Sequence, residues 1–262
     1  MKRMIRLGAL FSLVAALCIW LGSCTTSQAN PVALNVAAAG LFREVLVEID
    51  RIRQPENPGV VVNYTIAGSE VLKRRIEQGE SFDLVIASSP KPMDELEQKG
   101  LILSETRQPF VATQIALITP ADSQLPLSNF KDLTGDRVKT VAMSLEGPGV
   151  STYTNEILTN LKILQPLRAK AVLAKTDVRE ILNAVETGRA DAGITFLSEA
   201  RRSDKVKIVA TASPDLHRPV VTTLAVLKKS QHATETKQLV EFFKSQQAMA
   251  VFQQNGFELP RS

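Results

Sequence analysis

Residues with nucleophilic or metal-binding side chains are few in this sequence, and their spacing argues against catalysis. Ser88-Ser89-Pro90-Lys91 has the Ser-x-x-Lys spacing of acyl-transfer enzymes, but the companion Ser-Asp-Asn and Lys-Thr-Gly motifs are absent. The only histidines, His217 and His232, have no cluster of Cys, His, Asp or Glu at ligand spacing. The only tyrosines, Tyr64 and Tyr153, are too few for a tyrosine-rich ferric-ion site. We therefore predict a binding protein without catalysis, cofactor or bound metal.

One cysteine near the N-terminus has a different predicted chemistry. Three basic residues in the first six positions precede the uncharged apolar run Leu7–Leu21, and Leu21-Gly22-Ser23-Cys24 closes it. This is the pattern of a secretory signal, and its apolar run of 15 residues is too short to span a bilayer as a helix. The ending resembles a bacterial lipobox, whose cysteine is lipidated after cleavage. We expect residues 1–23 to be removed, Cys24 to carry the lipid anchor and residues 24–32 to form a tether. The alternative is an ordinary signal peptide, with Cys24 as a passenger thiol.

Removal of this signal changes the charge of the protein. The 262 residues contain 31 Lys+Arg and 27 Asp+Glu, with a net charge of +4 and a pI of about 9.1. Cleavage removes three basic and no acidic residues, which leaves 28 against 27, or +1. The densest basic run, Lys73-Arg74-Arg75, lies beside Glu70 and Glu77 and is typical of a solvated helix face. A nucleic-acid partner is therefore not predicted.

From Val32 onward, apolar strands alternate with amphipathic helices. In the first half of the mature chain each of three short strands leads into a helix, and glycines or prolines end the helices. This order with short connections predicts an α/β fold with a mostly parallel sheet. The predicted strands are Leu34–Ala38, Val60–Ile66 and Asp83–Ala87; the predicted helices are Leu41–Arg53, the segment from the Ala67-Gly68-Ser69 turn to Gln78, and Pro90–Lys99.

A second α/β set follows a longer predicted strand, Phe110–Ile118. A final strand and two helices end the chain, and their order suggests that the C-terminal segment returns to the first set. The predicted strands are Val138–Met143, Ala171–Leu173, Ala192–Phe196, Val206–Ala210 and Val220–Leu227; the predicted helices are Thr152–Leu164, Val178–Glu186, Thr234–Ser245 and Gln247–Gln254.

Two such sets predict two lobes joined by crossing strands. We place lobe 1 at residues 33–113 plus 217–262, and lobe 2 at residues 114–216. A cleft between the lobes is the natural ligand site, and hinge closure is the natural motion.

Short motifs between residues 34 and 260 occur in the order and spacing of one known family. They are Val36-Ala37-Ala38-Ala39-Gly40-Leu41, Ala67-Gly68-Ser69 with Leu72 and Ile76, Phe82–Ser88, Met93-Asp94, Gly147–Tyr153, Thr176–Arg179, Gly188–Ile194, and Gly256-Phe257 with Pro260. Together they resemble the periplasmic molybdate-binding proteins of ABC importers, here in a lipoprotein form. The resemblance implies the two-lobe, type II periplasmic-binding-protein fold.

The resemblance also implies a site that holds a tetrahedral oxyanion with hydroxyl and backbone N–H donors. The matching positions are Gly40, Ser69, Val150, Val178 and Phe196. Independently of the family, the helical pattern puts Gly40, Ser69 and Val178 at or near helix starts, with Val150 just before another. Helix N-termini suit an anion because their first N–H groups lack intrahelical partners and carry partial positive charge.

Three positions depart from the family pattern. The family has a serine where this chain has Gly40 and a tyrosine where it has Phe196, so two of three side-chain donors are missing. Neighbours that can substitute are Thr195, Ser88, Ser151, Thr152 or water. Glu70 stands where the family often has a small hydroxyl residue. Glu70 either favours the helix N-terminus and points to solvent, repels a dianion, or selects a ligand with a positive group.

The function implied by the resemblance is capture of molybdate or tungstate outside the cytoplasm. We expect a monomer, anchored in the periplasm by a lipid at Cys24, that delivers the oxyanion to a membrane permease driven by a separate ATPase. The alternatives are a protein that binds another small oxyanion or solute, and a sensor or enzyme on the same fold.

Overall fold

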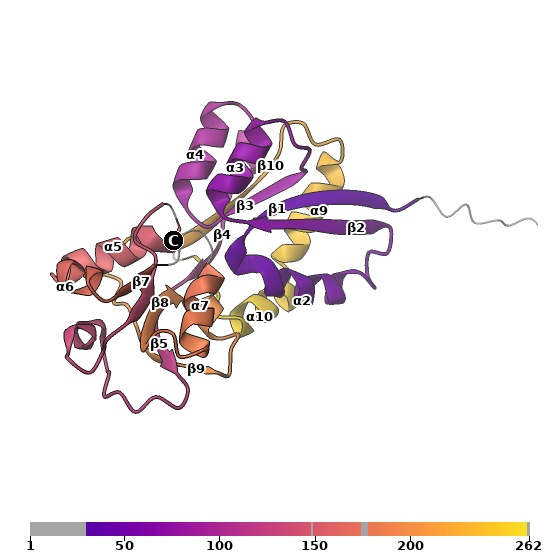
Figure 1. Cartoon of the computed structure of the whole chain (residues 1–262). Helices are drawn as coiled ribbons and strands as arrows, with labels where there is room; N and C mark the ends of the chain where they lie inside the picture. The colour runs from indigo at the N-terminus through magenta and orange to yellow at the C-terminus, as the bar shows by residue number, and fades with distance from the viewer. Residues whose placement is uncertain (1–29, 148, 174–177, 261–262) are drawn as a thin grey trace, which may run out of the picture. The chain divides into compact units, whose positions relative to one another are not determined.

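The computed structural model describes residues 30–147, 149–173 and 178–260 (Figure 1). The signal segment, Cys24 and nearly all of the predicted tether lie outside the described residues. Residues 32–262 form one compact unit. Within the described part of the chain, no helix is long and apolar enough to cross a membrane.

The first of two mixed sheets has five strands in the order β2-β1-β3-β10-β4. Strand β1 is parallel to both β2 and β3, and β10 is antiparallel to β3 and β4, so four of the five strands run in the same direction. This agrees with the predicted mostly parallel sheet. The strands are β1 (Val32–Ala39), β2 (Val60–Ala67), β3 (Leu84–Ala87), β4 (Gln108–Thr113) and β10 (Val220–Val226).

The second sheet also has five strands, in the order β7-β6-β8-β5-β9. Strand β6 is parallel to β7 and β8, while β5 is antiparallel to β8 and β9. Again four strands share one direction. The strands are β5 (Ile115–Pro120), β6 (Val141–Met143), β7 (Ala171–Leu173), β8 (Ala192–Phe196) and β9 (Val206–Thr211).

Helices cover both faces of the first sheet (Figure 1). Alternate residues of a strand point to opposite faces. Accordingly, Ala38 belongs to the same buried cluster as Leu46 of α2, whereas Ala37 belongs to a second cluster with Leu72 of α3 and Met93 of α4. The α-helices in the described residues are α2 (Arg43–Arg53), α3 (Ser69–Glu77), α4 (Pro90–Gln98), α5 (Val150–Asn160), α6 (Leu164–Arg168), α7 (Val178–Glu186), α8 (Leu197–Ala200), α9 (Ala233–Phe243) and α10 (Gln246–Gln254), and the 3₁₀ turns are η1 (Gly40–Phe42), η2 (Ser104–Thr106) and η3 (Phe130–Thr134).

The chain passes from one sheet to the other at a single residue. The sequence predicts one strand over Phe110–Ile118, but β4 ends at Thr113 and β5 begins at Ile115 in the other sheet. Gln114 joins them, and its carbonyl accepts a hydrogen bond from Leu197 N–H. The prediction of a single strand is therefore wrong. The residues on both sides of the crossing are apolar because both strands are buried, and Thr113 and Gln114 interrupt the run, so the pattern is that of one long strand with a polar interruption.

The two sheets share a continuous apolar core. Five phenylalanines form its aromatic part beside the first sheet, where Phe42 stacks on Phe257 with ring centroids 5.3 Å apart. The other members are Phe110, Phe243 and Phe252. The structure therefore defines which strands belong to each sheet. The division into two lobes, with boundaries at 113/114 and 216/217, stays a prediction.

Candidate functional site

Three strands of the first sheet end at the same edge, which we call edge one: the carboxyl ends of β1, β2 and β3. Because β1 is parallel to both neighbours, the residues that follow these strands gather there. Gly40 follows β1 and begins η1, Ser69 begins α3 one residue after the Gly68 N-cap, and Ser88 follows β3. Edge one therefore carries two of the predicted site residues, Gly40 and Ser69, next to Ser88. The carboxyl edge of a parallel sheet is where α/β proteins commonly bind ligands.

The side chains of Ser69 and Ser88 are bonded to each other. Ser88 N–H donates to Ser69 Oγ at 3.0 Å, and the two hydroxyl oxygens lie 3.1 Å apart, so one hydroxyl donates to the other. Ser69 is 8% exposed and Ser88 6% exposed. Each hydroxyl has one hydrogen, and one of the two hydrogens is used in the bond between them. The other hydroxyl therefore keeps an O–H that can donate outside the pair, whichever serine is the donor.

The corresponding edge of the second sheet, edge two, consists of the carboxyl ends of β6, β7 and β8. Val150 begins α5 after Gly149, whose φ of +98° is a conformation that favours glycine. Asn155 Nδ2 donates to the carbonyls of Leu145 and Ser151, each at 2.9 Å, and this joins the turn to the helix. The first N–H groups of α5 therefore have a defined position at edge two.

Close packing between a helix and a strand positions Val178. Val178 is the first residue of α7, which packs on β8. A Cβ atom on Gly193 of β8 would lie 2.8 Å from Val185 Cγ2 and 3.3 Å from Ile181 Cγ2. Glycine at this position thus allows the close approach of α7, whose N-terminus lies at edge two. Thr176, which belongs to the same family motif, lies outside the described residues.

Phe196 ends β8 at edge two, and its ring is 2% exposed. It meets the ring of Tyr153 from α5 edge to face, with centroids 6.2 Å apart and an interplanar angle of 67°. Burial raises the pKa of Tyr153 to about 12, so the phenol is neutral at physiological pH. Its hydroxyl is buried without a hydrogen-bond partner among the described residues. The Tyr153 ring therefore packs against Phe196.

Ion pairs connect the elements that follow edge one to those of edge two. Glu44, in the first turn of α2, pairs with Arg179 of α7 and lies 2.9 Å from Arg202 Nη2. Arg202 also pairs with Glu199 of α8 at 3.2 Å. The helix after Gly40 is thereby joined to the helix that Val178 begins. For Val150 and Phe196, the polar and ring contacts described give no such link to the first sheet.

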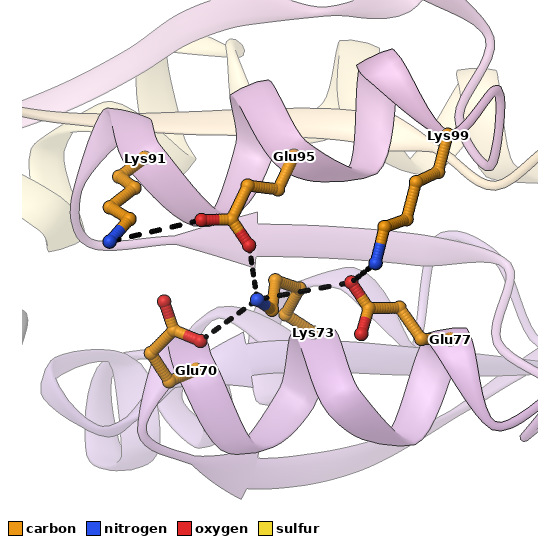
Figure 2. A network of polar contacts seen from close by, with 6 residues as sticks. All are labelled: Glu70, Lys73, Glu77, Lys91, Glu95 and Lys99. Atoms are coloured by element: carbon orange, nitrogen blue, oxygen red, sulfur yellow. Dashed lines mark hydrogen bonds and ion pairs between the residues drawn. The ribbon is translucent and has the colours of Figure 1, made fainter.

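Glu70 belongs to a charge network between α3 and α4 (Figure 2). Its carboxylate lies 3.1 Å from Lys73 Nζ, and Lys73 also pairs with Glu95 and, at 3.8 Å, with Glu77. The hydrogen bond with Glu95 raises the pKa of Lys73, and the same bond lowers the pKa of Glu95. Figure 2 shows the Glu70 side chain directed at Lys73 along the helix pair. Of the three interpretations of Glu70, a helix-surface carboxylate agrees best with this geometry.

Sequence reasoning named Ser88 only as one of several substitute donors, and it missed Glu44. Ser69 and Ser88 are 19 residues apart and Glu44 and Arg179 are 135 apart, so no local pattern reveals either contact. The other substitutes differ from Ser88. Ser151 Oγ donates to the carbonyl of Gly147, while Thr195 is fully buried without a hydrogen-bond partner among the described residues. In the described ranges, no group of three or more His, Cys, Asp or Glu residues can hold a metal ion.

Comparison with known proteins identifies the family. The model of the bacterial extracellular solute-binding protein family matches residues 34–258. The chain belongs to this family. The molybdate-binding protein ModA of Escherichia coli K12 is 32% identical over 236 residues, which cover 86% of this chain and 89% of ModA. Bacillus subtilis YvgL, named as a candidate ABC transporter substrate-binding lipoprotein, is 30% identical, and the match covers 89% of each chain.

Family membership confirms the predicted architecture. The structure of the periplasmic molybdate-binding protein of Azotobacter vinelandii matches with a TM-score of 0.78 and 20% identity, over 87% of this chain and 100% of that one. The two sheets with flanking helices thus form a type II periplasmic-binding-protein fold, as the sequence predicts. The family is one of bacterial extracellular solute-binding proteins, which confirms the prediction of a binding protein.

Proposed function

We propose that this solute-binding protein captures molybdate or tungstate through donors at Gly40, Ser69, Val150, Val178 and Phe196. At Ser69 the donors are the hydroxyl and the N–H; at Gly40, Val150, Val178 and Phe196 they are N–H groups. The ligand lies between edge one and edge two. Relatives that match most of the chain at 26–32% identity are named molybdate-binding proteins.

The observation that carries this proposal is the common position of these residues. Gly40, Ser69 and Phe196 lie at the carboxyl end of a strand or within two residues of it, Val150 and Val178 begin the helices that follow β6 and β7, and four of the five begin a helix or 3₁₀ turn. Such donors suit an anion without a full countercharge because the first N–H groups of a helix are unpaired and carry partial positive charge. A set of neutral donors also disfavours a protonated anion, whose own proton would face N–H groups.

In the same proposal, the two sheets belong to lobes that close on the ligand. Residues 33–113 with 217–262 form one lobe, residues 114–216 form the other, and the crossing at Gln114 is part of the hinge. The closed, loaded protein delivers the oxyanion to the permease of an ABC importer with its separate ATPase. A lipid on Cys24 holds the monomer at the membrane.

Calorimetric titration of the purified full-length protein in detergent tests the ligand. Molybdate, tungstate, sulfate and phosphate are titrated in turn, and we expect submicromolar binding of molybdate and tungstate only. Since Gly40 and Phe196 lack the family's hydroxyls, preferential binding of sulfate or phosphate would instead identify the protein as a carrier of another oxyanion. Micromolar or weaker binding of all four would refute the oxyanion proposal.

A further inference from the structure

The Ser69–Ser88 pair lies at the carboxyl end of β1. This strand is followed by Gly40, which has no side-chain donor. Strand β1 lies between β2 and β3 in the sheet, Ser69 follows β2, and Ser88 follows β3. Strands two places apart in a sheet are separated by about 9.5 Å. The two hydroxyl oxygens are nevertheless only 3.1 Å apart. The turns after β2 and β3 therefore converge over the end of β1, where the chain continues as Gly40.

The register of the sheet gives the same position for Ser88. In the β1–β3 ladder, Ala37 pairs with Val85 and Ala38 pairs with Ile86. Continued two positions beyond the last pair of the ladder, this register puts Ser88 at the level of Gly40. A Cβ atom added to Gly40 would meet no heavy atom within 4 Å, so the space at this level is open.

Hydrogen bonding prepares the serine pair to donate outward. Ser69 Oγ already accepts the Ser88 N–H, and one bond joins the two hydroxyls. The remaining O–H belongs to Ser88 if Ser69 is the donor, and to Ser69 if Ser88 is the donor. In both arrangements the outward O–H is polarised by the bonds behind it, which makes it a stronger donor to an anion than an isolated hydroxyl.

We propose that Ser88 is a positioning residue for anion binding: its bonds to Ser69 orient and polarise the outward O–H of the pair, which is the hydroxyl donor at the end of β1, where Gly40 has none. This inference rests on the proposed oxyanion function and adds Ser88 to its site. The class of ligand is an unprotonated tetrahedral oxyanion, one of whose oxygens accepts the outward O–H of the pair.

The test removes single hydroxyls and measures molybdate binding by calorimetry on the full-length protein. Ser88→Ala keeps the backbone N–H that bonds Ser69, so it removes only the hydroxyl. We expect binding to weaken by roughly tenfold, because Ser69 keeps an O–H but loses the hydroxyl bond that orients and polarises it. The matched control is Ser89→Ala. Ser89 is buried, its hydroxyl has no hydrogen-bond partner among the described residues, and its backbone is extended. Successive side chains of an extended segment point in opposite directions, so Ser88 and Ser89 face different sides. The control should bind within about twofold of wild type.

A second background tests whether the outward O–H of the pair acts at the end of β1, where Gly40 has no hydroxyl. In Gly40→Ser protein, Ser88→Ala should cost less than about threefold, because the new serine donates from the same level. An equal loss in both backgrounds would overturn this part of the inference. If the wild type and Ser88→Ala bind molybdate equally well, Ser88 has only a structural role, whether or not the variant melts at a lower temperature. In that case the inference about Ser88 fails and the proposed function stands. If wild type binds none of the four oxyanions, the proposed function fails together with it.

Discussion

Moving one hydroxyl between two facing aromatic rings gives a sharp test of the candidate site. Phe196 and Tyr153 meet edge to face, with centroids 6.2 Å apart, and both are almost fully buried. The resemblance gives position 196 the ligand-binding hydroxyl, and in the structure the Tyr153 ring packs against Phe196. Phe196→Tyr adds a hydroxyl at the proposed site, and Tyr153→Phe removes one outside it, with equal changes in size.

Opposite effects on affinity and stability are expected from the two variants. A hydrogen bond to a charged group contributes about 1.5–3 kcal/mol, so Phe196→Tyr should bind molybdate about 10- to 150-fold more tightly. Without ligand the added hydroxyl lacks a partner, and the free protein should lose about 1 kcal/mol of stability. The Tyr153 hydroxyl is buried without a partner among the described residues. Its removal should therefore raise the melting temperature by about 2–4 °C and leave affinity unchanged.

Calorimetry with molybdate and thermal unfolding without ligand measure these effects, and the double variant completes the cycle. Phe196→Tyr with wild-type affinity would show that position 196 does not face the ligand. A tenfold or greater loss of affinity in Tyr153→Phe would show that Tyr153 supplies the hydroxyl, and would refute the residue mapping.

Three further predictions concern charge, closure and anchoring. Glu70→Gln should bind molybdate within about twofold of wild type because Glu70 pairs with Lys73 in Figure 2, and a tenfold gain would mean that its charge faces the ligand. Glu44→Gln removes the ion pairs to Arg179 of α7 and to Arg202, and it should weaken molybdate binding by up to about fivefold at low salt. The loss should shrink at 1 M salt, where such pairs are screened, and calorimetry at both salt concentrations measures it. Cys24→Ser should abolish incorporation of radiolabelled fatty acid and release the exported protein from membranes; equal labelling of both proteins would contradict the lipid anchor.

Most of the fold is predictable from short-range pattern. Helical stripes and apolar strands predicted α2, α3, β1 and β2 within two residues at each end, because each pattern repeats within the element itself. One strand was predicted over Phe110–Ile118 where the structure has two, because both are buried and apolar on either side of Thr113-Gln114; the crossing itself lies at the predicted lobe boundary, 113/114.

The candidate site was only partly predictable. Sequence pattern located Ser69 and Val178 at helix starts, which the structure confirms. It gave three interpretations of Glu70 and four substitute donors without separating them. The network between α3 and α4 favours one interpretation of Glu70, and the Ser69 contact distinguishes Ser88 from the other three.

The sequence by itself determined the signal pattern, the alternation of strands and helices, the positions of helix N-termini and the absence of hydroxyls at Gly40 and Phe196. These properties depend on a residue's identity and on neighbours a few positions away. Only the tertiary structure decided that Ser88 lies at the level of Gly40, that Ser69 bonds to it, and that Glu44 reaches Arg179. Those contacts depend on strand order, register and the crossing between sheets, which bring together residues that no local pattern connects.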